Sequence, residues 1–459
     1  MHDTQDVKRD AQGPAPVGIL VRPFTQSSVA CKGDSGRLSG VLSLEHVQRF
    51  GTLKMNNLPQ TSISHPAATG RFIAIAFALA VTMAGATLAS PLYPLYEHAF
   101  GITSAGVTIV YSSYMAGALV ALLLLGHLSD HVGFVHALRI AVALLLAGLV
   151  ISAVAHALPV LAIGRFAIGI AAGIASSAAT AGLVALEPAW KVKRAALVGS
   201  IMNIAGLGLG PVAGGVVAQI LPHPLLTPYA VFGVSALLAL VALAIHPADA
   251  EVQPIRHFRP ALRFHVPTLA AVRPFAIASI TTFTGYTLFS LFASLAPAFL
   301  SDLLPWHGPA VAGTGVATLF VGSAIAQFTL RKVDSRRGLT FGALSIGASV
   351  VLMAASLPLH SGILFVASDL IGGFGQGLAF MSAVAVVNQI APPANRARMI
   401  SSFFSIAYLG GIVPIVGLGL LADRIGLDSS IGILSVVLGL LTIALGILAH
   451  RSSKTLGHA

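Results

Sequence analysis

Long apolar stretches alternate with short polar loops along this chain, from about residue 71 to residue 450. A helix needs about 20 predominantly apolar residues to cross the hydrocarbon core of a bilayer. Runs of that length recur twelve times, approximately at 72–95, 105–126, 137–158, 159–185, 195–220, 225–246, 274–300, 309–330, 339–358, 362–391, 399–422 and 429–449. The pattern predicts an all-α polytopic membrane protein with twelve transmembrane helices.

Composition and charge placement agree with this interpretation and predict an orientation. Hydrophobic residues make up 56% of the chain and charged residues 9%, too few charges to cover a soluble protein of this length. All Lys and Arg residues except Arg165 and Arg424 fall in the N-terminal segment, the even-numbered loops or the C-terminal tail. The positive-inside rule predicts two cytoplasmic termini in a bacterial-type inner (plasma) membrane. The formal charge of +11 is thus explained by topology, and no nucleic-acid partner is expected.

The first 70 residues differ from the rest, because they are polar and show no sustained helical period. We expect residues 1–70 to form a disordered tail, with Met55 as an alternative start of translation. Beyond it we expect four further parts: a six-helix half at 71–246, a cytoplasmic linker at 247–273, a second six-helix half at 274–450 and a tail at 451–459. The single cysteine, Cys31, lies in the N-terminal tail, so the membrane body offers no thiol for metal binding or catalysis.

An internal repeat relates the two predicted halves. A shift that places Gly169 on Gly373 also places Gly206 on Gly410. The same offset holds through the fourth and fifth predicted helices and their counterparts in the second half. Transporters built from such repeats hold their substrate near the membrane midplane, between the repeats. The repeat therefore predicts two pseudo-repeated six-helix bundles with a small-molecule substrate.

One stretch of the fifth predicted helix is rich in glycine and proline. Its pattern is Gly199-x6-Gly206-x3-Gly210-Pro211-x2-Gly214-Gly215. In water, each interior Gly weakens a helix by about 1 kcal/mol and an interior Pro by about 3 kcal/mol. In a membrane, neighbouring helices satisfy the backbone groups that Pro frees, and small residues four positions apart let another helix approach closely. We expect a kinked, closely packed transmembrane helix.

Three motifs resemble those of the major facilitator superfamily. They are the glycine-proline stretch, which resembles the fifth-helix motif of twelve-helix drug:proton antiporters; Leu161-x3-Arg165-x3-Gly169, which resembles a fourth-helix motif; and Gly126-x3-Asp130-x2-Gly133, which resembles the loop between helices 2 and 3. The loop copy is degenerate, because His131, Phe134 and Val135 occupy positions that are basic in the family. The resemblance implies the major facilitator fold over about 71–451 and transport driven by the proton gradient, with no other cofactor.

Two charges lie deep within predicted helices, and the repeat makes them counterparts. Arg165 is the one basic residue, and Asp369 the one acidic residue, that falls outside every tail, loop and helix end. A charge in the hydrocarbon is costly, so it normally faces a cavity or a partner. The family resemblance places both helices around a central cavity. We predict that the two residues form a latch and that Asp369 carries the coupling proton; the alternative is that each only holds helices together.

Three polar residues are weaker candidates for the same cavity. Gln376 follows Asp369 by seven positions, which places both on one helix face. Tyr286 in the seventh helix and Asn203 in the fifth have side chains that can form hydrogen bonds in an apolar cavity. For each of the three, the alternative is an ordinary polar contact between helices.

A cytoplasmic gate is implied by the loop motif. In the family, an acid lies between two glycines, at the positions of Asp130, Gly126 and Gly133, and caps the N-terminus of a helix from the other half. An anion is stabilised at the positive end of a helix. Here the expected target is the start of the eleventh helix, near Arg398, and the alternative is a solvated loop acid.

The predicted function is secondary active transport by alternating access, most simply proton-coupled efflux of small weakly polar or cationic compounds. One buried charge of each sign favours such substrates over strongly polar ones. Proton symport of a metabolite such as a sugar or organic acid is the alternative within transport. A membrane-embedded enzyme is the alternative outside it, although no H-E-x-x-H, G-x-S-x-G or Walker motif is present. We expect a monomer in the lipid bilayer, without a bound metal.

Overall fold

The computed structural model describes residues 65–246, 267–303 and 305–452 of the 459-residue chain. These residues fold into helices joined by loops, and 12 helical segments are long and apolar enough to cross a membrane. The prediction of an all-α protein with twelve spans is thus confirmed. The expected tails at 1–70 and 451–459 and the expected linker at 247–273 lie largely outside the described residues.

The α-helices follow the apolar runs closely. They are α1 (His65–Thr87), α2 (Tyr93–Phe100), α3 (Ser104–Val120), α4 (Leu128–Val132), α5 (Phe134–Ala153), α6 (Leu158–Ala185), α7 (Val192–Ile220), α8 (Thr227–Ile245), α9 (Leu269–Ser294), α10 (Ala296–Leu303), α11 (Pro309–Thr329), α12 (Ser335–Ser356), α13 (Gly362–Ile390), α14 (Arg396–Ile425) and α15 (Leu427–Arg451). We call α1–α8 the first set and α9–α15 the second set. Each set contains six of the spans.

The first and seventh spans are interrupted, which the apolar pattern did not predict. A 3₁₀ turn, η2 (Ser90–Leu92), separates α1 from α2, and Leu295 separates α9 from α10. Proline lies just after both interruptions, at Pro94 in α2 and Pro297 in α10. A proline has no N–H group to donate and suits the first turn of a helix. Each span therefore bends where a new helix begins.

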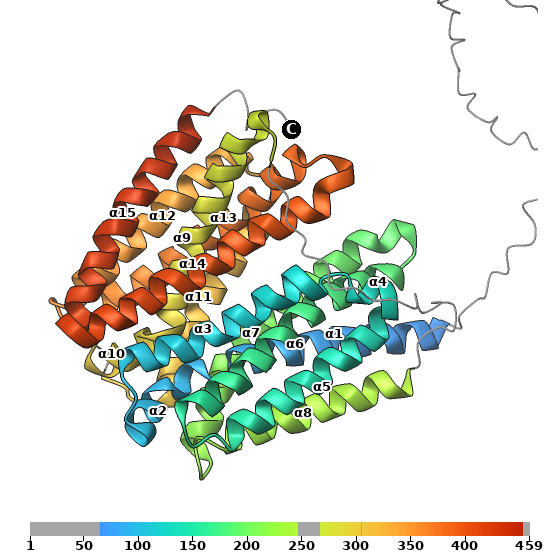
Figure 1. Ribbon diagram of the computed structural model, residues 1–459, viewed down its shortest axis with the longest axis horizontal. Helices are drawn as coiled ribbons and strands as arrows, with labels where there is room; N and C mark the ends of the chain where they lie inside the picture. The colour runs from blue at the N-terminus through green and yellow to red at the C-terminus, as the bar shows by residue number, and fades with distance from the viewer. Residues whose placement is uncertain (1–64, 247–266, 304, 453–459) are drawn as a thin grey trace, which may run out of the picture. The chain divides into compact units, whose positions relative to one another are not determined.

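The two sets of helices meet mainly through two pairs, α7 with α11 and α3 with α14 (Figure 1). Basic residues flank the starts of α7 and α12, and we call that end of the spans the basic end. Several of the closest approaches between the sets lie at the opposite end. There, Gly215 of α7 lies against the backbone of Pro309, and Gly419 of α14 lies against Ala105 and Thr108.

The glycine-proline stretch of α7 lies between two helices. On one side, Gly206 and Gly210 face the backbone of α1, and Gly214 faces that of Leu88 just after it. A Cβ atom built at Gly206 would lie 2.6 Å from the Ala80 carbonyl oxygen. On the other side, the carbonyl of Pro211 lies against Gly313 of α11. Small residues allow both approaches. The stretch therefore joins α1 of the first set to α11 of the second set.

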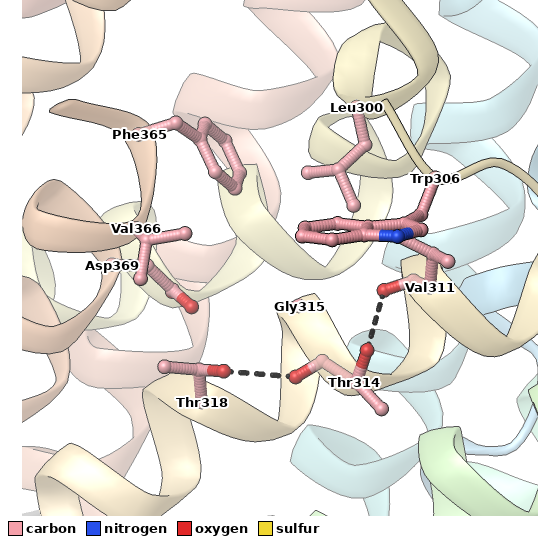
Figure 2. Close-up of a pocket in the computed structure, with 9 residues that line it drawn as sticks. All are labelled: Leu300, Trp306, Val311, Thr314, Gly315, Thr318, Phe365, Val366 and Asp369. Atoms are coloured by element: carbon pink, nitrogen blue, oxygen red, sulfur yellow. Dashed lines mark hydrogen bonds between the residues drawn. The ribbon is translucent and has the colours of Figure 1, made fainter. Parts of the chain in front are cut away.

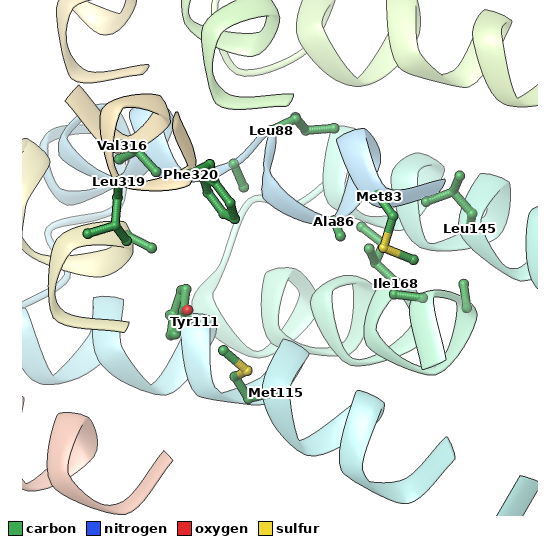
Figure 3. Packing of buried hydrophobic residues seen from close by; sticks show 14 of the residues in the cluster. Met83, Ala86, Leu88, Tyr111, Met115, Leu145, Ile168, Val316, Leu319 and Phe320 are labelled. Atoms are coloured by element: carbon green, nitrogen blue, oxygen red, sulfur yellow. The ribbon is translucent and has the colours of Figure 1, made fainter. Parts of the chain in front are cut away.

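A continuous apolar core runs from the first set to the second. Figure 3 shows Met83, Leu145 and Ile168 of the first set, with Leu319 and Phe320 of the second set in the same cluster. Many large apolar side chains are instead exposed on the outer helices, among them Val234 and Leu238 of α8 and Val436 and Leu440 of α15. An apolar surface of this kind is stable in contact with lipid rather than water. The exposure pattern agrees with twelve membrane-spanning helices.

Candidate functional site

The guanidinium of Arg165 is buried in the first set. Its side chain projects from α6, is 1% exposed, and has its Cζ atom 5.0 Å from the ring centroid of Tyr114 in α3. This distance is within the range of a cation–π interaction. The same guanidinium interacts electrostatically with the phenol groups of four further tyrosines: Tyr93, Tyr96, Tyr111 and Tyr229. Arg165 is therefore surrounded by aromatic rings and phenolic oxygens from α2, α3 and α8.

Part of the hydrogen-bonding capacity of this cluster is unused. Nε and Nη1 of Arg165 and the hydroxyl of Tyr93 are buried without a hydrogen-bond partner, whereas Tyr96 Oη donates to Tyr229 Oη at 3.0 Å. A guanidinium has five N–H donors and no acceptor. Buried donors are normally satisfied by protein, water or a ligand. Nε and Nη1 of Arg165 therefore have capacity for an acceptor atom.

Aromatic residues of the second set continue this cluster. Tyr286 of α9 packs against Tyr408 of α14 with ring centroids 5.5 Å apart, and Phe380 of α13 lies 6.5 Å from Tyr286. The phenol groups of Tyr286 and Tyr408 also interact electrostatically with that of Tyr114. All 7 tyrosines of the chain thus belong to one group that reaches from one set of helices to the other. We call this group, together with Arg165, the tyrosine cluster.

Asp369 lies in a different environment within the second set. It is 1% exposed on α13, and its Oδ1 atom has no hydrogen-bond donor. It is the only buried acidic side chain among those the structure describes. Figure 2 shows its carboxyl group pointing into a cavity of about 370 Å³. We call this cavity the Asp369 pocket; its lining residues are Leu300, Trp306, Val311, Thr314, Gly315, Thr318, Phe365, Val366 and Asp369.

The predicted latch between Arg165 and Asp369 is not formed in this structure. No ion pair joins these two residues, because each side chain points into its own set of helices. Arg165 faces α2, α3 and α8, whereas Asp369 faces α10 and α11. The internal repeat placed them on corresponding helices, but it did not specify the direction of either side chain.

The weaker cavity candidates fall into different places. Gln376 of α13 accepts a hydrogen bond of 2.9 Å from Ser323 Oγ, which itself accepts one from Gln327 at 3.0 Å. This short network joins α13 to α11. Tyr286 belongs to the tyrosine cluster. Asn203 is half-buried on α7 and forms no hydrogen bond with the other candidates described.

The predicted gate contact is also not formed in this structure. Asp130 is exposed in α4, which packs against α5 and α6, and it makes no ion pair with Arg398. Gly126 precedes α4, and Gly133 has a φ of 79° where α5 begins. The start of α14 therefore has no acid from this loop at its N-terminus.

Sequence reasoning did not single out several residues that complete these sites. Trp306, Thr314 and Thr318 line the Asp369 pocket, and Tyr229 interacts electrostatically with Arg165. Trp306 is one of only 2 tryptophans in the chain, which is the one sequence signal that could have drawn attention to it. The other residues become recognisable only when distant helices are brought together.

Comparison with known families and structures agrees on the fold. The family model described as Major Facilitator Superfamily matches residues 75–414. No curated protein sequence matches the chain. A bacterial homolog of the human lysosomal transporter Spinster, in an inward-facing and unoccupied conformation, has a TM-score of 0.70 at 14% identity, over 86% of this chain and 99% of that one.

Two transporters of other kinds are similar in the same way. A D-xylose-proton symporter has a TM-score of 0.67 at 16% identity and covers 84% of this chain and 99% of its own. A POT family transporter in complex with 5-aminolevulinic acid has a TM-score of 0.65 at 13% identity and covers 85% of this chain and 97% of its own. At such identities these similarities concern the fold alone.

Proposed function

Because this chain belongs to the Major Facilitator Superfamily, and is therefore a secondary transporter and not an enzyme, we propose that it exports small weakly polar or cationic compounds in exchange for protons. Asp369 carries this proposal. It is a buried carboxyl group in a membrane helix, with an unpartnered oxygen and an open cavity in front of it. Burial disfavours the charged form of a carboxyl group, and a nearby cation favours it. A proton and a cationic compound can therefore alternate at this group.

The alternating-access cycle in this proposal uses the contacts between the two sets of helices. We place the basic end in the cytoplasm of a bacterial-type inner membrane, since basic loops remain on that side. The close approaches of α7 to α11 at Gly215, and of α14 to α3 at Gly419, then lie on the outer side. The protein, acting as a monomer, would separate these helix pairs to release its substrate outward. In that state, Asp130 would approach the start of α14.

Proton flux in proteoliposomes tests the direction of coupling. Purified protein is reconstituted into vesicles with a trapped pH-sensitive dye and an acidic lumen, and a panel of lipophilic cations, sugars and organic acids is added outside. Antiport predicts that at least one weakly polar or cationic compound causes proton release from the lumen. Proton movement in the same direction as the added compound would contradict antiport.

One observation favours a second candidate, proton symport of a metabolite. The unused Nε and Nη1 donors of Arg165, beside the Tyr93 hydroxyl, suit an oxygen acceptor such as a carboxylate. In the same vesicles, this candidate predicts that an organic acid or sugar enters together with protons. Loss of that signal in Arg165→Met, with cation-driven proton release retained, would assign the two activities to different sites.

A further inference from the structure

The Asp369 pocket is built entirely from the second set of helices. Its walls come from α10, the loop after it, α11 and α13. A volume of about 370 Å³ is near the lower end of the range for small-molecule sites, about 300–1,000 Å³. The pocket is thus large enough for one small ligand and does not depend on the contact between the two sets.

The polar atoms that face this pocket are almost all acceptors. Thr314 Oγ1 donates to the Val311 carbonyl and Thr318 Oγ1 donates to the Thr314 carbonyl, each at 2.9 Å (Figure 2). Both hydroxyl protons are therefore used within α11, and the two oxygens offer lone pairs to a ligand. With the carboxylate of Asp369, three side chains supply acceptors to one small volume.

No cationic side chain among the lining residues balances this group of acceptors. The nine lining residues include no Lys, Arg or His, and Oδ1 of Asp369 has no donor. A buried carboxylate is costly unless it is paired or neutralised. The pocket is therefore complementary to a ligand that brings a positive charge.

The rest of the lining is apolar or aromatic. Phe365 is 2% exposed and Leu300 is 3% exposed, so both form the buried part of the wall. Trp306 is 68% exposed and follows α10, so it forms the edge of the pocket at the end opposite to the basic end. Aromatic faces attract organic cations, and Trp attracts them most strongly. Charge and wall together favour an organic cation with an apolar body over an inorganic ion.

We propose that the Asp369 pocket is a binding site for a monovalent organic cation, whose charge lies at Asp369 and whose apolar body lies between Trp306 and Phe365. The inference rests on the proposed function, because the cation and the coupling proton share one carboxylate. It adds that the exchange takes place inside the second set of helices, beside α10 and α11. In the orientation proposed above, Trp306 lies at the outer end of the spans, where the helix pairs separate and an exported cation leaves while a proton enters.

Trp306 provides a direct reporter of occupancy. Trp190 is the only other tryptophan, so a Trp190→Phe variant leaves Trp306 as the single tryptophan. This variant is placed in phosphatidylcholine nanodiscs. We expect benzyltrimethylammonium to change Trp306 fluorescence saturably, whereas its uncharged carbon analogue, neopentylbenzene, gives no saturable change. In this background, Asp369→Asn is expected to weaken the apparent affinity by about tenfold or more. Asp428→Asn, which alters an exposed acid at the start of α15, is expected to have no effect.

A second variant keeps the test decisive if Asp369→Asn does not fold. Thr318→Val preserves the side-chain shape but removes one acceptor oxygen, so the affinity for benzyltrimethylammonium is expected to fall severalfold. Equal responses to the charged and uncharged compounds, or unchanged affinity in both variants, would overturn the proposal. Saturable cation binding without proton release in vesicles would contradict antiport and leave the site intact. Proton release that depends on Asp369, without cation-induced fluorescence change, would contradict the site and leave antiport intact.

Discussion

Helices α6 and α13 occupy corresponding places in the two sets and pack in the same way. Gly169 of α6 lies against the backbone of Tyr114 in α3, and Gly373 of α13 lies against the backbone of Leu319 in α11. Each helix also carries one buried charge, at the position that the repeat makes equivalent. The backbone packing of the two halves has thus remained alike around residues of opposite charge.

The surroundings of the two charges are not alike. Arg165 is enclosed by aromatic rings and phenolic oxygens, whereas Asp369 faces a cavity with threonine oxygens and an exposed tryptophan. The tyrosine cluster extends across both sets of helices, but the Asp369 pocket belongs to one. The duplicated scaffold thus sets where a charge lies, and the neighbouring helices determine what the charge can bind.

The largest expected effect tests the shared scaffold. Gly169→Leu and Gly373→Leu each place a side chain against the backbone of the neighbouring helix, which cannot move aside as a flexible side chain can. Overpacking of this kind costs about 3 kcal/mol or more, so both variants should lose most of their folded protein in a detergent thermal-stability assay. Gly417→Leu is the control, because no atom lies within 4 Å of its Cβ position. A large loss for only one of the first two variants would contradict the shared packing.

The next effect separates a functional Arg165 from a merely structural one. Arg165→Met removes a buried charge that has two unsatisfied N–H groups, while keeping a long side chain. Exchanging buried charges for apolar groups is often neutral for stability. We expect thermal stability to change by less than about 1 kcal/mol, while proton-coupled transport of a substrate with an oxygen acceptor, such as an organic acid, falls about tenfold or more in proteoliposomes. A large loss of stability would instead support the alternative that Arg165 only holds helices together.

The smallest effect concerns the polar network behind Asp369. Ser323→Ala removes the hydrogen bond to Gln376 and the acceptor for Gln327, so it should lower the free energy of unfolding by about 1–2 kcal/mol. In the first set, Ser177 of α6 donates only to carbonyls of its own helix. Ser177→Ala should therefore cost no more than about 0.5 kcal/mol. Equal losses in thermal unfolding would show that the network joining α13 to α11 contributes nothing.

The spans were predictable because each apolar run is long enough to cross a bilayer, and loops interrupt the runs. The bend after α9 was not predictable, since the sequence stays apolar through Leu295, whereas the prolines at η2 suit a helix end or kink. Whether a proline kinks a helix or begins a new one depends on packing with the next helix. The glycine-proline stretch of α7 predicted close packing with other helices, but it did not predict that these helices are α1 and α11.

Part of the candidate site was also predictable. Arg165 and Asp369 were recognisable as charges within apolar helices, because such residues are costly in hydrocarbon. Their partners were not, because the tyrosines around Arg165 come from three helices separated along the chain. The direction of Asp369 toward Trp306 depends on the rotation of α13 against α11. The apolar pattern and the internal repeat of the sequence do not determine that rotation.

Substrate-induced proton release in proteoliposomes that contain Asp369→Asn tests directly whether Asp369 carries the exchanged proton. A compound that releases protons through the unmodified protein is applied to vesicles with this variant and with the control variant Asp428→Asn. Asparagine cannot carry the exchanged proton, so release should fall to the level of protein-free vesicles in the first and remain unchanged in the second. Undiminished proton release through correctly folded Asp369→Asn protein would show that Asp369 does not carry the exchanged proton.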